Sequence, residues 1–381
     1  SDLTDSATNG ELILTNAVGA LSKHIQGTQE LSAQDLALQS SKIDEFAKLM
    51  KRTPALIQSM FDLVDTYESS DKGPLFVGGT RRPFPRTSPS AIDGHELERA
   101  MLQVQQSILD EVYNAGVLRA CSSTIFANRG WKTASYYPGE ALMPDVSSQN
   151  IIHSVVIKAN FPQTWGRPVA FDGAHAQKPT GWYLSPGALA TVTLPAAVVG
   201  KGYKIMVGVH ASDNKWKTEV KRMDRVTTQF DVVTSTTYIA NPLGGSIYVL
   251  VPLADAGLIQ VQISGGVITS PLFRRTSFDQ MTNAQWAQSR TTALAPWVDF
   301  ETDAFMLSVP RSWVYKYDDP EALMERYAKS MEGASEWLGY PPAYRNRKVL
   351  FVGVDLHIRA GAYGVGYPQV NNLFNAGRDY G

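Results

Sequence analysis

The sequence predicts a multidomain α+β chain, in which an N-terminal helical region is followed by an antiparallel β-sandwich and then by the start of an α/β unit. Apolar residues recur every three or four positions through residues 1–117, the period shortens to two from about residue 150, and helix and strand patterns alternate after residue 276. We therefore divide the chain into a helical region (1–120), a β-sandwich (121–275) and the beginning of the α/β unit (276–381).

Length and composition agree with this division. The chain has 381 residues, and at roughly 100–200 residues per domain this length allows two or three domains. Hydrophobic residues make up 44% and charged residues 19% of the chain, which is ordinary for a protein with a buried core and excludes wholesale disorder.

The helical region shows apolar stripes over residues 11–25, 35–50 and 93–114, each of which predicts a helix. A further helix is predicted to begin at Pro54, because proline suits the first helical position and Thr53 can cap the free N–H groups there.

The sandwich is predicted from short apolar runs that turn residues separate. These strand candidates are residues 151–157, 190–194, 203–209, 246–251 and 258–263. In the last segment, a helix over 320–338 precedes a strand over 348–355, which is the beginning of an α/β unit.

Charge and hydropathy exclude two classes of partner. Lys and Arg number 35 and Asp and Glu 36, so the formal net charge is -1 and we expect no nucleic-acid partner. No run approaches the roughly 18 apolar residues of a membrane-spanning helix. The single Cys121 excludes an internal disulfide and a zinc site of several thiolates, and we interpret it as a small buried side chain.

The six histidines form no zinc-binding helix, because no two of them lie four residues apart. His95-Glu96 begins like the HExxH motif, but Arg99 occupies the position of the second ligand. An ordinary acidic first turn of a helix is therefore favoured there. His210 and Asp213 at a strand end either bind a cation or are merely solvated.

Five residues are candidates for contact with a ligand. Asp355 and His357 leave the last predicted strand, where polar groups often line a cleft. The rings of Trp165, Trp182 and Trp216 could stack on sugar rings, although core packing is the more frequent role of such side chains.

Three blocks of the second half carry a resemblance. They are residues 202–210 followed by 241–249, residues 295–310, and residues 352–361 running into 366–368. In this order, over roughly residues 190–381, they resemble the enhancin-like, mucin-targeting zinc metallopeptidases of peptidase family sixty.

The resemblance implies that a sandwich with a GG-[IL]-Y strand precedes a zincin-like catalytic domain. The family holds zinc with HExxH and a more distal acidic residue, and neither occurs in this sequence. We therefore expect the zinc ligands to lie beyond Gly381 and this fragment to be inactive alone. In the intact protein, zinc would polarise the scissile carbonyl while a Glu-assisted water attacks it.

The implied function is that of a secreted or cell-surface bacterial enzyme that hydrolyses O-glycosylated, mucin-like proteins and recognises their glycan. Its expected partners are a glycosylated protein substrate and carbohydrate. No catalytic or metal-binding residue is expected in this fragment. The candidate substrate-binding residues are Tyr367, His357, Asp355, Trp182 and Trp216.

Two other interpretations stay open. The sandwich could be a non-catalytic carbohydrate- or protein-binding module of a bacterial surface protein, or the chain could be a plain structural or adhesive surface protein. The next thirty or so codons of the parent gene would separate these interpretations: an HExxH motif there would favour the peptidase, and a stop codon would remove it.

Overall fold

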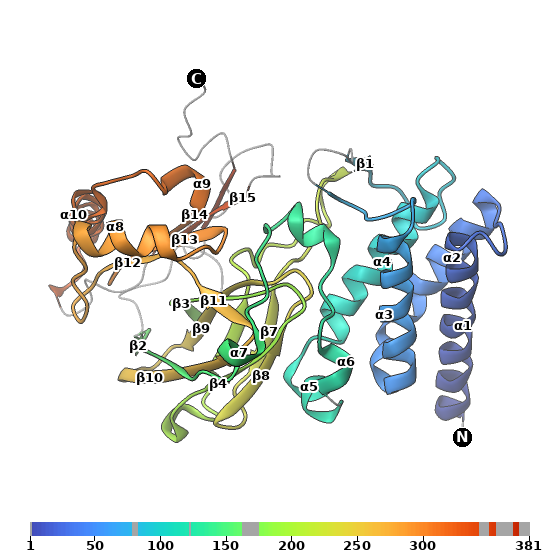
Figure 1. Cartoon of the computed structure of the whole chain (residues 1–381), viewed down its shortest axis with the longest axis horizontal. Coiled ribbons are helices and arrows are strands. Elements are labelled where there is room, and N and C mark those ends of the chain that lie inside the picture. The colour runs from blue at the N-terminus through green and yellow to red at the C-terminus, as the bar shows by residue number, and fades with distance from the viewer. Residues whose placement is uncertain are drawn as a thin grey trace.

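The computed structural model describes residues 2–77, 83–121, 123–161, 175–342, 350–355 and 369–372. A group of helices lies at one end of the molecule, two antiparallel sheets lie in the middle, and a mixed sheet with its own helices lies at the other end (Figure 1). The predicted α+β architecture is confirmed.

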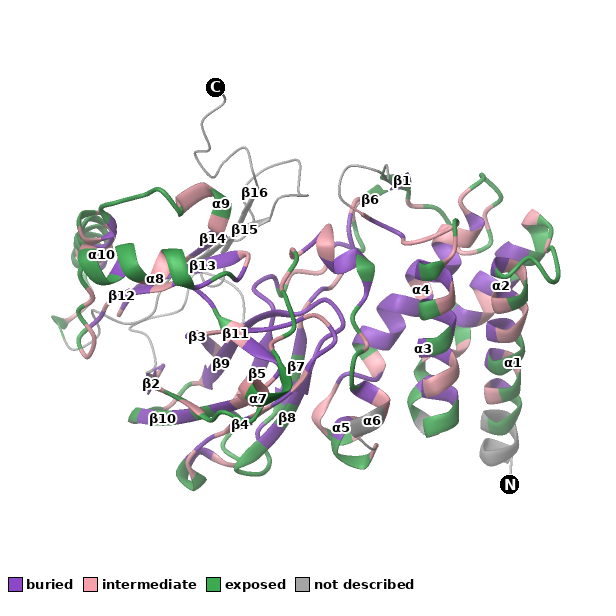
Figure 2. Cartoon of the chain, viewed as in Figure 1, coloured by how far each residue is buried: buried purple, intermediate pink, exposed green. Residues whose placement is uncertain are grey.

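The helical region follows the predicted stripes, and its buried faces point toward one another (Figure 2). Its helices are α1 (Asp2–Ile25), α2 (Ala33–Phe46), α3 (Pro54–Ser69), α4 (Glu96–Glu111), α5 (Ala115–Ala120) and α6 (Ser123–Phe126). The predicted cap is confirmed, because the Thr53 hydroxyl accepts the Leu56 N–H. The single helix predicted over 35–50 is wrong at its end, where a 3₁₀ turn, η1 (Ala47–Arg52), continues from α2.

The sandwich consists of two sheets whose strands all pair antiparallel. The first sheet has the order β2 (His153–Asn160), β10 (Asp255–Gly265), β4 (Leu189–Thr193) and β8 (Thr236–Ala240). The second has the order β11 (Val267–Thr269), β3 (His175–Leu184), β9 (Gly245–Pro252), β5 (Lys204–Val207) and β7 (Thr228–Asp231). A two-stranded ribbon joins β1 (Phe84–Pro85) to β6 (Glu219–Val220), and η3 (Ala196–Val198) follows β4.

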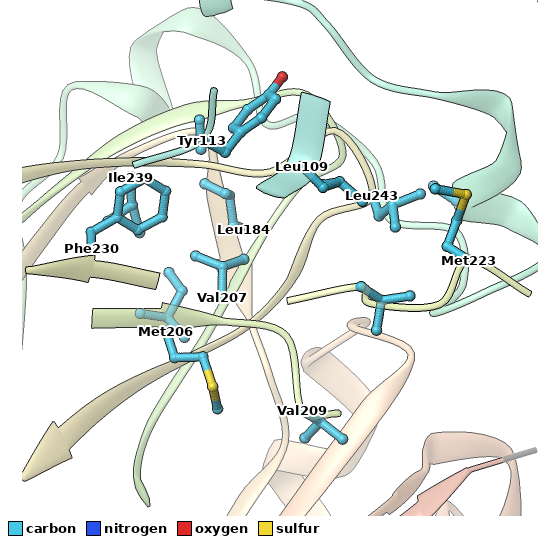
Figure 3. Close-up of a cluster of buried hydrophobic side chains, with 14 of the residues drawn as sticks. Leu109, Tyr113, Leu184, Met206, Val207, Val209, Met223, Phe230, Ile239 and Leu243 are labelled. Carbon is cyan, nitrogen blue, oxygen red and sulfur yellow. The ribbon is translucent and has the colours of Figure 1, made fainter. Parts of the chain in front are cut away.

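The helical region packs on the sandwich through apolar side chains. Figure 3 shows Leu109 of α4 and the neighbouring Tyr113 in one buried cluster with sandwich residues that include Phe230 and Leu243. Burial of such side chains is the main favourable term in folding. A charged pair also joins the two regions, since Arg225 binds Asp110 of α4.

The mixed sheet has the order β12 (Leu272–Arg275), β13 (Trp297–Thr302), β14 (Phe305–Pro310), β15 (Leu350–Asp355) and β16 (Gln369–Asn372). Its helices are α8 (Asn283–Thr292), α9 (Arg311–Val314) and α10 (Pro320–Trp337). The pairs β12–β13 and β14–β15 are parallel, and each is bridged by helix, as the α/β prediction requires. The predicted helix over 320–338 is confirmed as α10.

The two faces of the mixed sheet differ because successive strand residues point to opposite sides. Phe300 of β13 contacts Trp286 of α8, with ring centroids 5.2 Å apart. On the opposite face, the Asp299 carboxylate accepts a hydrogen bond from the Tyr248 hydroxyl of β9 at 2.9 Å. Helices therefore cover one face, and the sandwich covers the other.

Candidate functional site

The structure places the predicted binding residues in different parts of the molecule. Trp182 lies in β3, Trp216 lies between β5 and β6, and Asp355 is the last residue of β15, although its side chain is not described. Tyr367, His357 and Trp165 lie outside the described residues.

One end of the mixed sheet collects several strand ends. Trp297 at the start of β13 pairs with Pro310 at the end of β14, and Ser308 of β14 pairs with Gly353 of β15. Since β14 and β15 are parallel, β15 also ends here, at Asp355. Residues that flank this end are therefore the natural place to look for a binding site.

A cleft of about 1060 Å³ opens beside this end, where the three regions of the chain meet. We call it the junction cleft. Its lining comes from Val77 and from side chains within residues 131–135, 140–153, 182–186, 267–269 and 292–294. Leu294, which lies three residues before β13, connects the cleft to the end of the mixed sheet.

An aromatic pair forms one wall of the junction cleft. The imidazole of His153, at the start of β2, stacks on the indole of Trp182 with ring centroids 3.8 Å apart and planes at 27°. The β3–β9 register shifts between Pro179 and Tyr183, and Gly181 has a φ of 75°. This irregularity of β3 re-aims the side chain beside it, as β-bulges do.

Burial lowers the pKa of His153 from its ordinary value. The imidazole is therefore neutral at neutral pH, and its stack with Trp182 has an uncharged surface.

A second wall is fixed to the helical region by Glu68 of α3. The Glu68 carboxylate accepts the backbone N–H groups of Lys132 and Thr133, and the Lys132 ammonium donates to the Glu68 carbonyl oxygen at 2.9 Å. The backbone N–H of Trp131 donates to the Pro242 carbonyl oxygen of the sandwich at 2.9 Å. Burial raises the pKa of Glu68 to about 7, despite these hydrogen bonds.

A buried aromatic cluster supports the segment that leads into the cleft. His210 Nδ1 lies 2.5 Å from the Tyr137 hydroxyl, and its ring meets the Trp297 indole at 4.8 Å. The Trp297 indole N–H donates to the Pro138 carbonyl at 2.8 Å. His210 is thus buried between the sandwich region and the mixed sheet, and the interpretation as a solvated loop-end histidine is wrong.

The described residues do not fit a zinc ion. No three His, Cys, Asp or Glu side chains within the described ranges come together to hold a metal. Asp213, the suggested partner of His210, instead binds Arg225 at 2.8 Å.

The near-motif at His95 has an ordinary structural role. Glu96 accepts the N–H groups of Asp93 and Gly94 in the first turn of α4, while the His95 ring stacks on Phe84. The interpretation as an acidic first turn is confirmed.

Two other predicted side chains lie away from the junction cleft. Trp216 is 58% exposed, so core packing is the wrong interpretation for it, and the Lys217 ammonium lies 4.3 Å from its ring centre. Cys121 is partly buried, and burial raises the pKa of its thiol, which disfavours a nucleophilic thiolate.

Sequence reasoning found Trp182 but missed its neighbours. His153 and Trp131 come from segments about 30 and 50 residues away along the chain. One sequence signal was available: the apolar run Leu142-Met143-Pro144 lies in a segment with neither helical nor strand periodicity. In the structure the Leu142 side chain is 82% exposed, as apolar residues at binding sites often are.

Two family models match this chain side by side. The N-terminal domain of M60-like peptidases matches residues 169–264, and Peptidase M60, enhancin and enhancin-like, matches residues 266–376. Together they cover more than half of the chain, in the order that the sequence predicted. The chain belongs to the M60 peptidase family.

The curated relatives of this M60 chain are channel-associated proteins. The TRPM8 channel-associated factor homolog of Xenopus laevis is 30% identical over 207 residues, which cover 54% of this chain and 22% of the relative. TRPM8 channel-associated factor 2 of Homo sapiens is 28% identical over 197 residues, which cover 51% of this chain and 21% of the relative. The chain thus spans about a fifth of the length of these relatives.

A solved metallopeptidase shares the fold over nearly the whole chain. The IMPa metallopeptidase from Pseudomonas aeruginosa is 12% identical, with a TM-score of 0.55, over 89% of this chain and 39% of that structure. The structure of IMPa in complex with an O-glycopeptide has a TM-score of 0.52 and 12% identity, and the match covers 88% of this chain and 39% of that structure. Residues 121–381 make up only about two thirds of the chain. A match over 89% of the chain therefore extends into the N-terminal helical region as well.

Proposed function

We propose that the protein is a zinc metallopeptidase that hydrolyses peptide bonds in O-glycosylated, mucin-like proteins and recognises the glycan. The observation that carries this proposal is the pair of family matches over residues 169–376. The zinc would need ligands outside the described residues. The likeness to a metallopeptidase that was solved with an O-glycopeptide supports the substrate class.

We propose two roles for this chain within that enzyme. The junction cleft holds part of the substrate, and Asp355, His357 and Tyr367 line the approach to the reacting bond. We also propose that the protein works in secreted form or at a cell surface, where mucin-like glycoproteins are found. None of the helices in the described ranges is long and apolar enough to cross a lipid bilayer.

The proposal is tested with the natural full-length protein and one peptide in two forms, with and without an O-linked sugar. We expect cleavage beside the glycosylated residue and none of the sugar-free form. The isolated 381-residue chain is expected to cleave neither form, and turnover by it would refute the prediction that it is inactive alone.

A protein-binding module is the second candidate function. The names of the curated relatives describe association with a channel, and their similarity spans about half of this chain. This candidate predicts that the natural protein captures a partner without hydrolysing it and does so equally well in the presence of a chelator.

A further inference from the structure

We infer that the junction cleft binds the polypeptide of an O-glycosylated substrate, as an uncharged segment rich in Pro, Thr and Ser in the polyproline II conformation. This inference rests on the proposed function for its substrate class. Chains rich in Ser and Thr with Pro are the typical carriers of dense O-glycosylation.

The chemistry of the lining favours a peptide over a sugar. Trp182 and His153 present aromatic surfaces, the edge of the buried Trp131 adjoins them, and most other lining side chains are aliphatic. Grooves lined by aromatic side chains are the usual receptors for proline-rich segments, whose rigid helix loses little entropy on binding.

Several polar side chains of the lining are engaged within the protein. The Ser135 hydroxyl donates to the Lys132 carbonyl at 2.8 Å, and the Thr292 hydroxyl donates to carbonyls of its own helix. The Lys132 ammonium is held by the Glu68 carbonyl. A pyranose needs several convergent hydrogen-bonding groups, whereas a proline-rich chain needs apolar contact and few of them.

The charge of the junction cleft complements an uncharged chain. Lys132 and Glu140 contribute one charge of each sign to the lining. Burial lowers the pKa of His153, so the third ionisable lining group is neutral. A Pro, Thr and Ser segment has no ionisable side chain and therefore adds no charge to this nearly neutral site.

The size of the cleft suits an extended ligand. Its 1060 Å³ lies just above the roughly 300–1,000 Å³ typical of small-molecule pockets. A polyproline II chain advances about 3.1 Å per residue, so several consecutive residues can lie along the cleft toward the end of the mixed sheet.

The test uses the 381-residue chain and three probes: a sugar-free peptide of alternating Pro and Thr, a Gly-Ser peptide of equal length, and a free galactose-containing disaccharide. Binding is followed by calorimetry and tryptophan fluorescence. We expect saturable binding of the Pro-Thr peptide alone. Displacement of that peptide by the disaccharide, or the absence of saturable binding, would overturn the inference.

Two variants locate the binding. Trp182→Ala removes the aromatic wall, and Leu294→Glu places a charge at a rim position that is already 62% exposed and so tolerates substitution. Each is expected to weaken the affinity at least tenfold. Trp337→Ala, which replaces an 87% exposed tryptophan at the end of α10 and outside the cleft, is the matched control and leaves the affinity unchanged.

Unaltered affinity in the folded Leu294→Glu protein would contradict the assignment even if Trp182→Ala failed to fold. The test requires neither metal nor turnover. Peptide binding without hydrolysis by the natural protein would therefore overturn the proposed function and leave the peptide site standing.

Discussion

The two junctions of the sandwich differ in how deeply their charged pairs are buried. Against the helical region, charged pairs of mixed burial accompany an apolar cluster: both side chains of Arg225–Asp110 are about one third exposed, and those of Arg86–Asp224 are 24% and 8% exposed. On the side of the mixed sheet, Arg274 and Glu301 form a pair at 3.1 Å with each side chain only 6% exposed, and Arg274 also donates to the Pro179 carbonyl of the sandwich. We therefore expect the first junction to tolerate loss of Asp110 and the second to require both members of its pair.

The largest expected effect comes from breaking the buried pair. Glu301→Ala leaves Arg274 desolvated, with the Pro179 carbonyl as a remaining acceptor, and should lower the free energy of unfolding by about 3–5 kcal/mol. Urea unfolding followed by tryptophan fluorescence measures this loss. An effect below about 1 kcal/mol would show that the interface is hydrated rather than closed.

A second prediction concerns the wall of the junction cleft. Burial raises the pKa of Glu68 from 4.5 to about 7, so the folded protein retains a proton that the unfolded chain releases. This contribution to stability is fully present below pH 4.5 and is lost as the pH rises toward and through 7.

The free energy of unfolding should therefore fall by up to about 3 kcal/mol between pH 5 and pH 8 through this group. In Glu68→Gln, that part of the pH dependence should vanish. Thermal unfolding of both proteins across this range is the measurement. A difference between them that does not change with pH would mean that the carboxyl titrates normally.

The smallest effect is expected at the rim of the helical junction. Asp110→Ala removes one partner of Arg225, which keeps Asp213 at 2.8 Å. Because these groups are partly solvated, the loss should be about 0.2–1 kcal/mol and should shrink further in salt. A loss as large as that of Glu301→Ala would erase the proposed contrast between the junctions.

The sequence predicts those elements in which apolar residues mark the buried face or a capping residue marks the end. Apolar stripes located the helices, and Thr53 with Pro54 located the start of α3. Elements that bury polar residues were not predicted. β3 contains the buried Gln177 and Lys178, so it shows no alternation of apolar and polar residues. Helix α8 buries only Trp286, so no stripe marked it.

The candidate site was less predictable than the fold. The aromatic type of Trp182 marked it as a possible ligand contact, but its partner His153 and the wall at Trp131 meet it only through tertiary packing. His210 was expected at a solvated strand end, and its burial depends on Tyr137 and Trp297 from distant segments. Such contacts depend on topology, which local pattern does not encode.

The proposed function makes this M60 chain part of a metal-dependent glycopeptidase. Mass spectrometry of a single O-glycopeptide, incubated with the natural protein with and without a zinc chelator, is the decisive measurement. We expect a new peptide terminus next to the sugar-bearing residue, which disappears with the chelator and returns with added zinc. An intact glycopeptide in every condition, or cleavage that ignores the chelator, would contradict it.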